Sequence, residues 1–345
     1  MSMATATHPS PRPPRQPRRA LHGVILLDKP LGLSSNDALQ KVKRLLRAEK
    51  AGHTGTLDPL ATGLLPLCFG AATKFSQVSL DADKRYTATL QLGVRTSTAD
   101  AEGEVISSRE VTTDMLAPER LRAACDAFVG DIDQVPPMHS ALKHQGRALY
   151  EYAREGVEIE RAPRRVTLHA IDILSVQGTV VTLDVRCSKG TYIRTLAEDI
   201  GEHLGCGAHL MGLRRTGSGG VSLQGAVTLE ALQAMTETER DAHLLAPDVL
   251  LSDCPEALLS QDDAARFLTG MRRKVGLGNA PLVRVYGPLP GAATALQNPS
   301  SDRRVLLGSA HVQAGELIPT RLLSPLEVQG LVSQQAIAPP ALATH

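Results

Sequence analysis

The sequence predicts an α+β fold followed by a small β-rich domain near the C-terminus. Residues 86–92 and residues 181–187 alternate apolar with polar side chains, and this period of two is typical of half-buried strands. Segments with helical spacing lie among such strands, but without the regular βαβ order of a doubly wound sheet. The 345 residues, 42% of them hydrophobic, are enough for about two domains.

Local signals place the first elements. The apolar run at residues 24–27 predicts a strand that ends in the Pro/Gly turn of residues 28–32. Ser34 can cap a following helix, in which apolar residues recur at helical spacing. The opposite face of this helix is basic, and it fits either a solvated surface or an RNA-facing one: Lys41, Lys43, Arg44 and Arg47.

Later elements follow from the same rules. Pro118 predicts the start of a short helix that ends at Gly130. Residues 193–204 carry one apolar stripe, and Gly205 predicts the end of that helix. Three short strand-like segments separated by turn residues predict the β-rich module: residues 282–286, 305–308 and 316–323.

Composition divides the chain into four parts. The first 20 residues are rich in Pro and Arg, so we expect a disordered basic tail, which either attracts RNA phosphates or has no role. We expect a main domain at residues 21–248, with an acidic linker around residues 245–260. The β-rich domain is expected at residues 249–325 and a flexible tail at residues 326–345.

The charges are unevenly distributed although the net charge is only +1. Residues 1–60 hold ten basic and four acidic side chains, whereas residues 230–263 hold nine acidic side chains and one basic one. No run of about 18 to 20 apolar residues suggests a membrane span, and no signal peptide is recognisable. The five scattered cysteines predict reduced thiols and therefore a cytoplasmic protein.

Asp58 is the first candidate catalytic residue. It lies between Gly55 and Gly63 and directly before Pro59, a setting that favours a turn and presents the carboxylate from a loop. An Asp-Pro turn taken alone is more often structural than catalytic.

Several ordered motifs resemble the bacterial type of the TruB family of tRNA pseudouridine synthases. They are DKPLGLSS at residues 28–35, GHTGTLDP at 52–59, KRY at 84–86, QVPP at 134–137, SALK at 140–143, Tyr150 with REG at 154–156, and CSKGTYIR at 187–194. The resemblance implies a pseudouridine synthase fold with a mixed, largely antiparallel sheet. It also implies isomerisation of uridine 55 in the T loop of tRNA, by base flipping and without cofactor or metal.

The resemblance assigns three catalytic roles. Asp58 would be the nucleophile, attacking either the base or the sugar C1′. A carboxylate in a pocket that excludes water needs a fixed cation to stay ionised, and Arg194 matches the family residue in that role. Tyr86 would stack on the flipped base and take part in proton transfer.

Further residues are assigned to the substrate pocket by the same resemblance. Tyr192 would line the pocket and Leu213 would close it from the apolar side. His53 would fill the space left by the extruded nucleotides, and Asp100 would order the loops of the site. Lys29 would support the pocket or contact a phosphate.

Other signals bear on partners and alternatives. His139 stands where the family has Tyr or Phe, which puts local packing in doubt. Residues 306–310 and 317–323 resemble a PUA-type barrel, which implies contact with the acceptor side of tRNA, or else a stabilising appendage. We expect a monomer. The spacing of His203, Cys206 and His209 does not make a convincing zinc site, and SKGT at residues 188–191 lacks the order of a phosphate loop.

Two other functions are alternatives to the isomerase. One is a tRNA-binding or tRNA-folding chaperone that uses the same cleft without turnover. The other is a guide-RNA-dependent relative, which the continuous fit to the bacterial-type motifs disfavours. The presence of Asp58 favours an enzyme, because a protein that only binds RNA does not need a carboxylate near phosphates.

Overall fold

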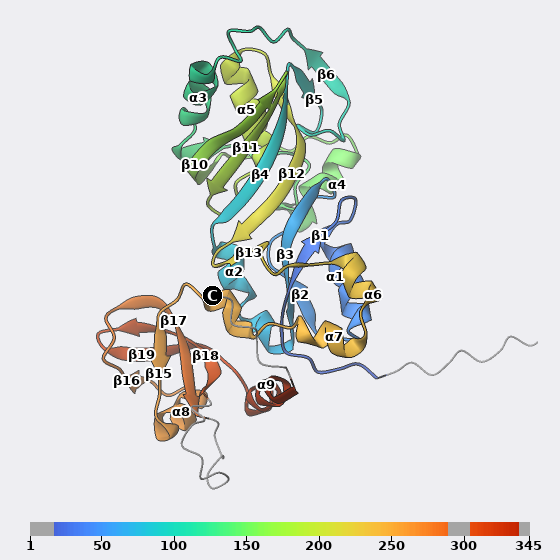
Figure 1. The fold of residues 1–345 in the computed structure, drawn as a ribbon. Helices are drawn as coiled ribbons and strands as arrows, with labels where there is room; N and C mark the ends of the chain where they lie inside the picture. The colour runs from blue at the N-terminus through green and yellow to red at the C-terminus, as the bar shows by residue number, and fades with distance from the viewer. Residues whose placement is uncertain (1–16, 289–303, 338–345) are drawn as a thin grey trace, which may run out of the picture.

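The computed structural model describes residues 17–288 and 304–337. Figure 1 shows an elongated larger part built on one long sheet, and a smaller part with its own sheet beside the lower end of the first. Within the described ranges, no helix is long and apolar enough to cross a membrane.

The large sheet has ten strands, and its main path runs β14-β1-β3-β12-β4-β11-β10-β7, with β2 paired to β3 and β13 to β12. The pairs β1–β14 and β3–β12 are parallel and the others are antiparallel, as the prediction of a mixed, largely antiparallel sheet requires. The strands are β1 Gly23–Lys29, β2 Ala51–His53, β3 Ala61–Phe69, β4 Lys84–Leu92, β7 Gly130–Gln134, β10 Arg164–Gln177, β11 Val180–Cys187, β12 Ala208–Ser218, β13 Val221–Ser222 and β14 Val227–Thr228.

Helices and short hairpins surround this sheet. The helices are α1 Ser35–Leu45, the 3₁₀ helix η1 Gly70–Lys74, α2 Ser76–Asp81, α3 Pro118–Asp126, α4 Leu149–Arg154, α5 Ile193–Leu204, α6 Leu229–Ala234 and α7 Glu237–Ala242. One hairpin consists of β5 Val94–Thr96 and β6 Val105–Ser108, and the other of β8 Lys143–His144 and β9 Arg147–Ala148. The side chain of Ser34 caps α1, and Gly205 ends α5 in a left-handed conformation with φ of 94°, as predicted. Helix α3 ends earlier than expected, because Gly130 already begins β7.

The small sheet has five strands in the order β15-β17-β18-β19-β16, which confirms the expected β-rich module. Its elements are η2 Pro247–Leu251, β15 Glu256–Leu258, α8 Gln261–Leu268, β16 Arg273–Lys274, β17 Ala280–Pro288, β18 Arg304–Gln313, β19 Glu316–Leu322 and α9 Pro325–Ile337. Residues 245–260 are therefore not a simple linker. They form η2 and β15, and they bury Leu250, Leu251 and Ala257 in a core shared by both parts.

The expected tails need correction. Residues 325–337 form α9 rather than the start of a flexible tail, because Val328 and Leu331 bury their side chains at 1% and 4% exposure. Glu327 of the same helix accepts a hydrogen bond from Lys74 at 2.5 Å and so ties α9 to the larger part. The expected flexible residues 338–345 and most of the expected disordered tail, residues 1–16, lie outside the described ranges.

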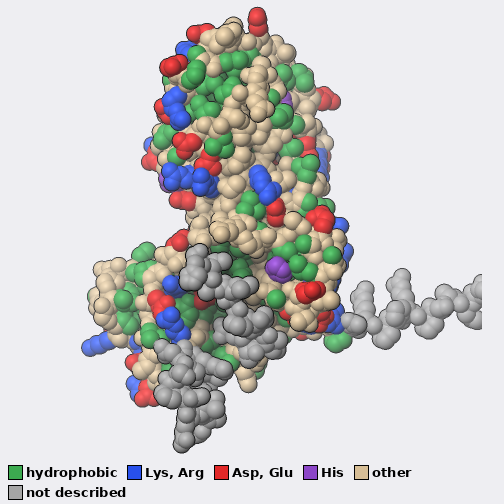
Figure 2. Space-filling view, in the orientation of Figure 1, with side chains coloured by type: hydrophobic (Ala, Val, Ile, Leu, Met, Phe, Trp, Pro, Cys, Tyr) green, Lys and Arg blue, Asp and Glu red, His purple; other side chains and the backbone are tan. Residues whose placement is uncertain are grey.

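The basic N-terminal segment and the acidic segment partly neutralise each other. Arg19 donates a 3.0 Å hydrogen bond to Asp241, and Arg47 donates one to Glu237 at 2.5 Å. On the face drawn in Figure 2, Lys and Arg side chains of the described residues likewise lie among Asp and Glu side chains. The uneven charge of the sequence therefore becomes a more mixed surface in three dimensions.

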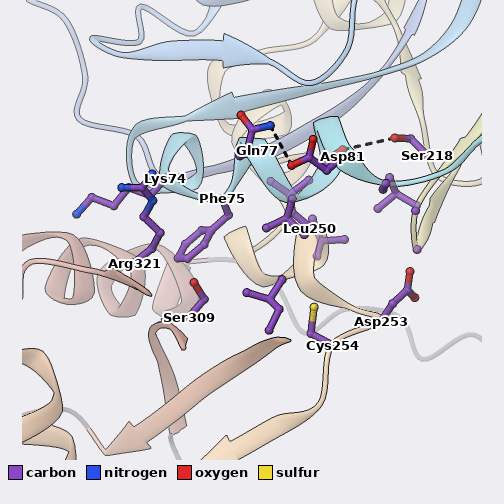
Figure 3. Close-up of a pocket in the computed structure, with 18 of the residues that line it drawn as sticks. Lys74, Phe75, Gln77, Asp81, Ser218, Leu250, Asp253, Cys254, Ser309 and Arg321 are labelled. Atoms are coloured by element: carbon purple, nitrogen blue, oxygen red, sulfur yellow. Dashed lines mark hydrogen bonds between the residues drawn. The ribbon is translucent and has the colours of Figure 1, made fainter. Parts of the chain in front are cut away.

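A pocket of about 500 Å³ lies between the two parts. Phe75 and Leu250 contribute apolar surface, while Asp81 and Asp253 lie toward one side of the pocket and Arg321 toward the other (Figure 3). The pocket marks where α2 and η2 meet the small sheet.

Candidate active site

The loop between β2 and β3 carries Asp58 and is held from two sides. Ser35, at the start of α1, accepts a 2.7 Å hydrogen bond from the Leu57 amide and donates one of 3.1 Å to the Leu57 carbonyl. Thr54 is fully buried and accepts a 2.9 Å hydrogen bond from Ser79. The loop backbone is therefore fixed while the Asp58 side chain keeps 45% of its surface exposed.

Arg194 joins this loop to two others. From the first turn of α5, its Nη2 lies 3.0 Å from Asp58 Oδ2, and its Nη1 lies 3.4 Å from Asp100 Oδ2. It also donates to the carbonyls of Thr98 at 3.4 Å and His139 at 2.6 Å. Because only 7% of its side chain is exposed, the guanidinium is a fixed, largely buried cation between two carboxylates.

The two tyrosines lie close to this ion pair. Tyr86, on β4, is 9% exposed, and burial raises the pKa of its phenol while the nearby Arg215 opposes that rise. Tyr192 directly precedes α5, and burial raises its pKa as well, against an opposing interaction with Ser140. Gln134 holds the Tyr192 backbone by donating to its carbonyl at 3.0 Å and accepting from its amide at 2.8 Å.

Lys29 and His53 flank the Asp58 loop. Lys29 is fully buried and donates to the carbonyls of Pro30 at 3.0 Å and Leu33 at 2.6 Å, so its ammonium supports the turn between β1 and α1 and does not face solvent. Burial lowers its pKa to about 8, although Asp58 opposes this shift. His53 is the last residue of β2. Burial, and to a smaller extent the positive charge of Arg215, lowers the pKa of its imidazole.

Asp100 and Leu213 also reach the site. Asp100 is 3% exposed and accepts hydrogen bonds from the Thr98 hydroxyl at 2.5 Å and the Glu102 amide at 3.1 Å. Leu213 lies on β12, directly opposite Ala61 of β3 on one side and Ala88 of β4 on the other. All eight site residues predicted from the sequence therefore lie on the elements that meet around the Asp58 loop.

Residues that sequence reasoning questioned have clear positions. Arg194 contacts His139 through its backbone carbonyl, a contact that does not depend on the side chain that replaces the expected Tyr or Phe. His203 packs edge-on against Phe128, and His209 bonds the Val94 carbonyl at 2.9 Å. Across the part of the chain that the structure describes, no group of three His, Cys, Asp or Glu side chains is arranged to hold a metal ion.

Arg215 was missed as a site residue, although its neighbour Leu213 was predicted. It is 1% exposed and donates to the carbonyl of Leu64 at 2.7 Å and to that of Gly55, in the Asp58 loop, at 3.2 Å. The signal available in the sequence was an arginine pair beside Leu213, but only burial distinguishes its two members.

Known proteins are similar to this chain over most of its length. The model of the TruB family pseudouridylate synthase N-terminal domain matches residues 43–193, and that of the tRNA pseudouridylate synthase B C-terminal domain matches residues 194–254. A protein named tRNA pseudouridine synthase B from Ralstonia pickettii (strain 12J) is 58% identical over 324 residues, which cover 92% of this chain and 99% of that protein. A protein of the same name from Verminephrobacter eiseniae (strain EF01-2) is 55% identical, with 93% of this chain and 94% of that protein covered.

Solved structures agree on the fold. An archaeal box H/ACA sRNP Nop10–Cbf5 complex contains a chain that is 24% identical, with a TM-score of 0.63 and with 89% of this chain and 87% of that chain covered. A chain of an H/ACA RNP bound to a substrate RNA containing 2′-deoxyuridine is 23% identical, with a TM-score of 0.64 and coverage of 90% and 88%. The pseudouridine synthase fold is confirmed, and the family matches and the 58% identical relative show that this chain belongs to the TruB family of pseudouridylate synthases.

Proposed function

We propose that this protein converts uridine 55 in the T loop of tRNA into pseudouridine. The observation that carries the proposal is the Asp58–Arg194 pair, in which a loop carboxylate is fixed at 3.0 Å from a buried guanidinium yet remains 45% exposed. A carboxylate in this state is oriented and accessible, as a nucleophile must be. Membership of the TruB family and relatives named tRNA pseudouridine synthase B support the same reaction.

The reaction rearranges one nucleotide. A stacked uridine must first leave the T loop, and the rings of Tyr86 and Tyr192, beside the half-exposed Asp58 carboxylate, offer surfaces to receive it. Attack by Asp58, at the base or at C1′, breaks the bond between N1 and C1′. The base then turns, and a bond forms between C5 and C1′ as the bond to Asp58 breaks and frees the carboxylate. The C5 proton leaves while N1 gains a proton. The product is an isomer of the substrate, so the atoms balance without a second reactant.

The residues around Asp58 have separate roles in the proposed reaction. Arg194 orients Asp58. Asp100, which accepts hydrogen bonds from the Thr98 hydroxyl and the Glu102 amide, in turn holds Arg194. Tyr86 stacks on the base and relays the C5 proton. Leu213 closes the pocket, and His53 occupies the space that the extruded nucleotides leave.

The rest of the chain supplies RNA contacts. We propose a catalytic domain at residues 21–248 and a PUA-like domain at residues 249–325, which contacts the acceptor side of tRNA while the catalytic domain holds the T arm. All five cysteines are free, which is typical of a reducing compartment and supports work in the cytoplasm. We propose that the protein acts as a monomer.

The test is tritium release from a T-arm stem-loop labelled at uridine C5. We expect release with the wild-type protein, and none with Asp58→Asn, which keeps the shape of the side chain without its charge. Asp126→Asn, an exposed position at the end of α3, is the matched control and should behave as wild type. A wild-type protein that binds the stem-loop but releases no tritium would leave the chaperone alternative in place.

The position is tested separately. A stem-loop with cytidine in place of uridine 55, and with its remaining uridines labelled, should release no tritium. Release from that RNA would contradict the assignment to position 55 and leave the isomerase activity standing.

A further inference from the structure

Arg215 is a buried cation without an acidic partner. Its side chain is 1% exposed, and no ion pair joins it to any carboxylate in residues 17–288 or 304–337. Burying an unpaired charge is costly, and proteins retain such groups mainly where function requires them. The neighbouring Arg214 is different, because it is 44% exposed and pairs with Asp28 at 2.6 Å.

The contacts of Arg215 point to the active site. Nε donates to the Leu64 carbonyl at 2.7 Å, which anchors the side chain on β3. Nη2 donates to the Gly55 carbonyl at 3.2 Å, three residues before Asp58. The guanidinium also interacts with the Tyr86 phenol. One side chain therefore bridges the loop of the nucleophile and the residue that stacks on the base.

The sheet fixes this arrangement. Arg215 lies on β12, directly opposite Gly63 of β3 and Tyr86 of β4. Directly opposite residues of antiparallel strands point to the same face, so Arg215 and Tyr86 project together toward the loop. Gly55 has φ of 85°, and a Cβ there would lie 3.2 Å from Arg215 Nη1, so the loop and the guanidinium are in close contact.

Two other cations that bond carbonyls, Lys84 and Arg240, form none of these bonds with the Asp58 loop. Lys84 donates to the carbonyls of Ser79 at 2.9 Å and Leu80 at 2.8 Å, within its own turn. Arg240 donates to the carbonyls of Leu232 at 2.6 Å and Gln233 at 3.2 Å, near α6. Arg215 differs because its partners include the catalytic loop and Tyr86.

We propose that Arg215 is a positioning residue for the reaction, which fixes the Asp58 loop through the Gly55 carbonyl and holds the Tyr86 hydroxyl. The carboxylate and the phenol then face the flipped uridine from fixed directions. This inference rests on the proposed isomerase function. A second consequence is electrostatic: the guanidinium opposes the rise that burial causes in the pKa of Tyr86.

The test compares Arg215→Lys and Arg215→Gln with wild type by steady-state tritium release and by thermal unfolding. In Arg215→Lys the charge remains but the two-sided contact is lost, so kcat should fall about 100-fold while KM changes less than about threefold. In Arg215→Gln the positive charge is lost as well, so the pKa of Tyr86 should rise. Any increase in kcat at alkaline pH that follows ionisation of Tyr86 should then occur at higher pH than in wild type. Arg240→Lys also removes guanidinium bonds to carbonyls and should keep wild-type kcat.

Gly55→Ala tests the same contact without changing Arg215. Its Cβ crowds Nη1, so kcat should fall while KM and binding of the stem-loop change little. Gly146→Ala is the control for backbone strain, because Gly146 also has φ of 85° but nothing lies within 4 Å of an added Cβ, and it should keep wild-type kcat. This variant decides the question if neither Arg215 variant folds. Inactive wild-type protein would overturn the proposed function itself. Active wild type together with wild-type kcat in the folded fraction of Arg215→Lys, or of Gly55→Ala where it decides, would overturn only the positioning role.

Discussion

Replacing Arg194 with Met tests the charge arrangement of the site most directly. Methionine keeps much of the length and apolar packing of arginine but removes every hydrogen bond to Asp58, Asp100 and the two carbonyls. The substitution therefore separates what Arg194 contributes to stability from what it contributes to catalysis, because the two carboxylates differ in exposure.

The two carboxylates should respond differently. The Asp100 side chain is 5% exposed, so the loss of Arg194 leaves a buried charge without its partner. This should cost about 3 kcal/mol of unfolding free energy, the lower end for a broken buried pair, because the Thr98 hydroxyl and the Glu102 amide still donate to Asp100. The Asp58 side chain is 45% exposed, so its lost ion pair should add less than about 1 kcal/mol. For catalysis Asp58 matters most, and a nucleophile that is no longer aimed should slow turnover about 100- to 1000-fold.

Single-turnover tritium release and urea unfolding measure the two effects. The double variant Arg194→Met/Asp100→Asn should regain most of the lost stability, because no buried charge is left unpaired, but it should remain as slow as Arg194→Met. Arg109→Met is the control, since Arg109 forms an exposed pair with Glu202 at 2.9 Å and should change neither quantity by much. Recovery of activity in the double variant would refute the role of Arg194 toward Asp58.

Three further outcomes are expected. Burial, and to a smaller extent Arg215, lowers the pKa of His53, so the contribution of His53 to stability is present above the unfolded pKa of about 6.5 and is lost as pH falls through the folded pKa. On acidification, His53→Gln should therefore lose less unfolding free energy than wild type in urea unfolding, and equal losses would contradict this. Binding of the T-arm stem-loop should weaken about tenfold or more between about 50 and 200 mM salt. The reason is that three cations of α1 form no ion pair within the described residues: Lys41, Lys43 and Arg44. Filter binding measures this, and an affinity that does not change with salt would contradict it. Leu331→Ala should lower the unfolding free energy by about 2 to 4 kcal/mol, whereas an unchanged value would mean that α9 does not pack as described.

The elements predicted correctly are those with local signals. Helices α1 and α5 have a capping serine or a terminal glycine, and β4 and β11 have the period of two. Strand β3 was missed because it lies in the middle of the sheet and is buried at nearly every position, so its residues form a continuous apolar run without alternation. Helix α9 was missed because its packing against η1 and the small sheet is a long-range contact that no local pattern records.

The site shows the same division. The family resemblance identified the candidate site residues. The sequence alone could not show that Arg194 bridges two carboxylates of unequal exposure, because the contacts and the exposure depend on how three loops meet. Arg214 and Arg215 make the limit clearest, since they are adjacent and chemically identical. On a strand they must point to opposite faces, so one pairs with Asp28 at the surface and the other is buried against the Asp58 loop. Had residues 208–218 been recognised as a strand that pairs with β4, the alternation would have assigned Arg215 to the face of Tyr86 and made it a candidate from the sequence alone.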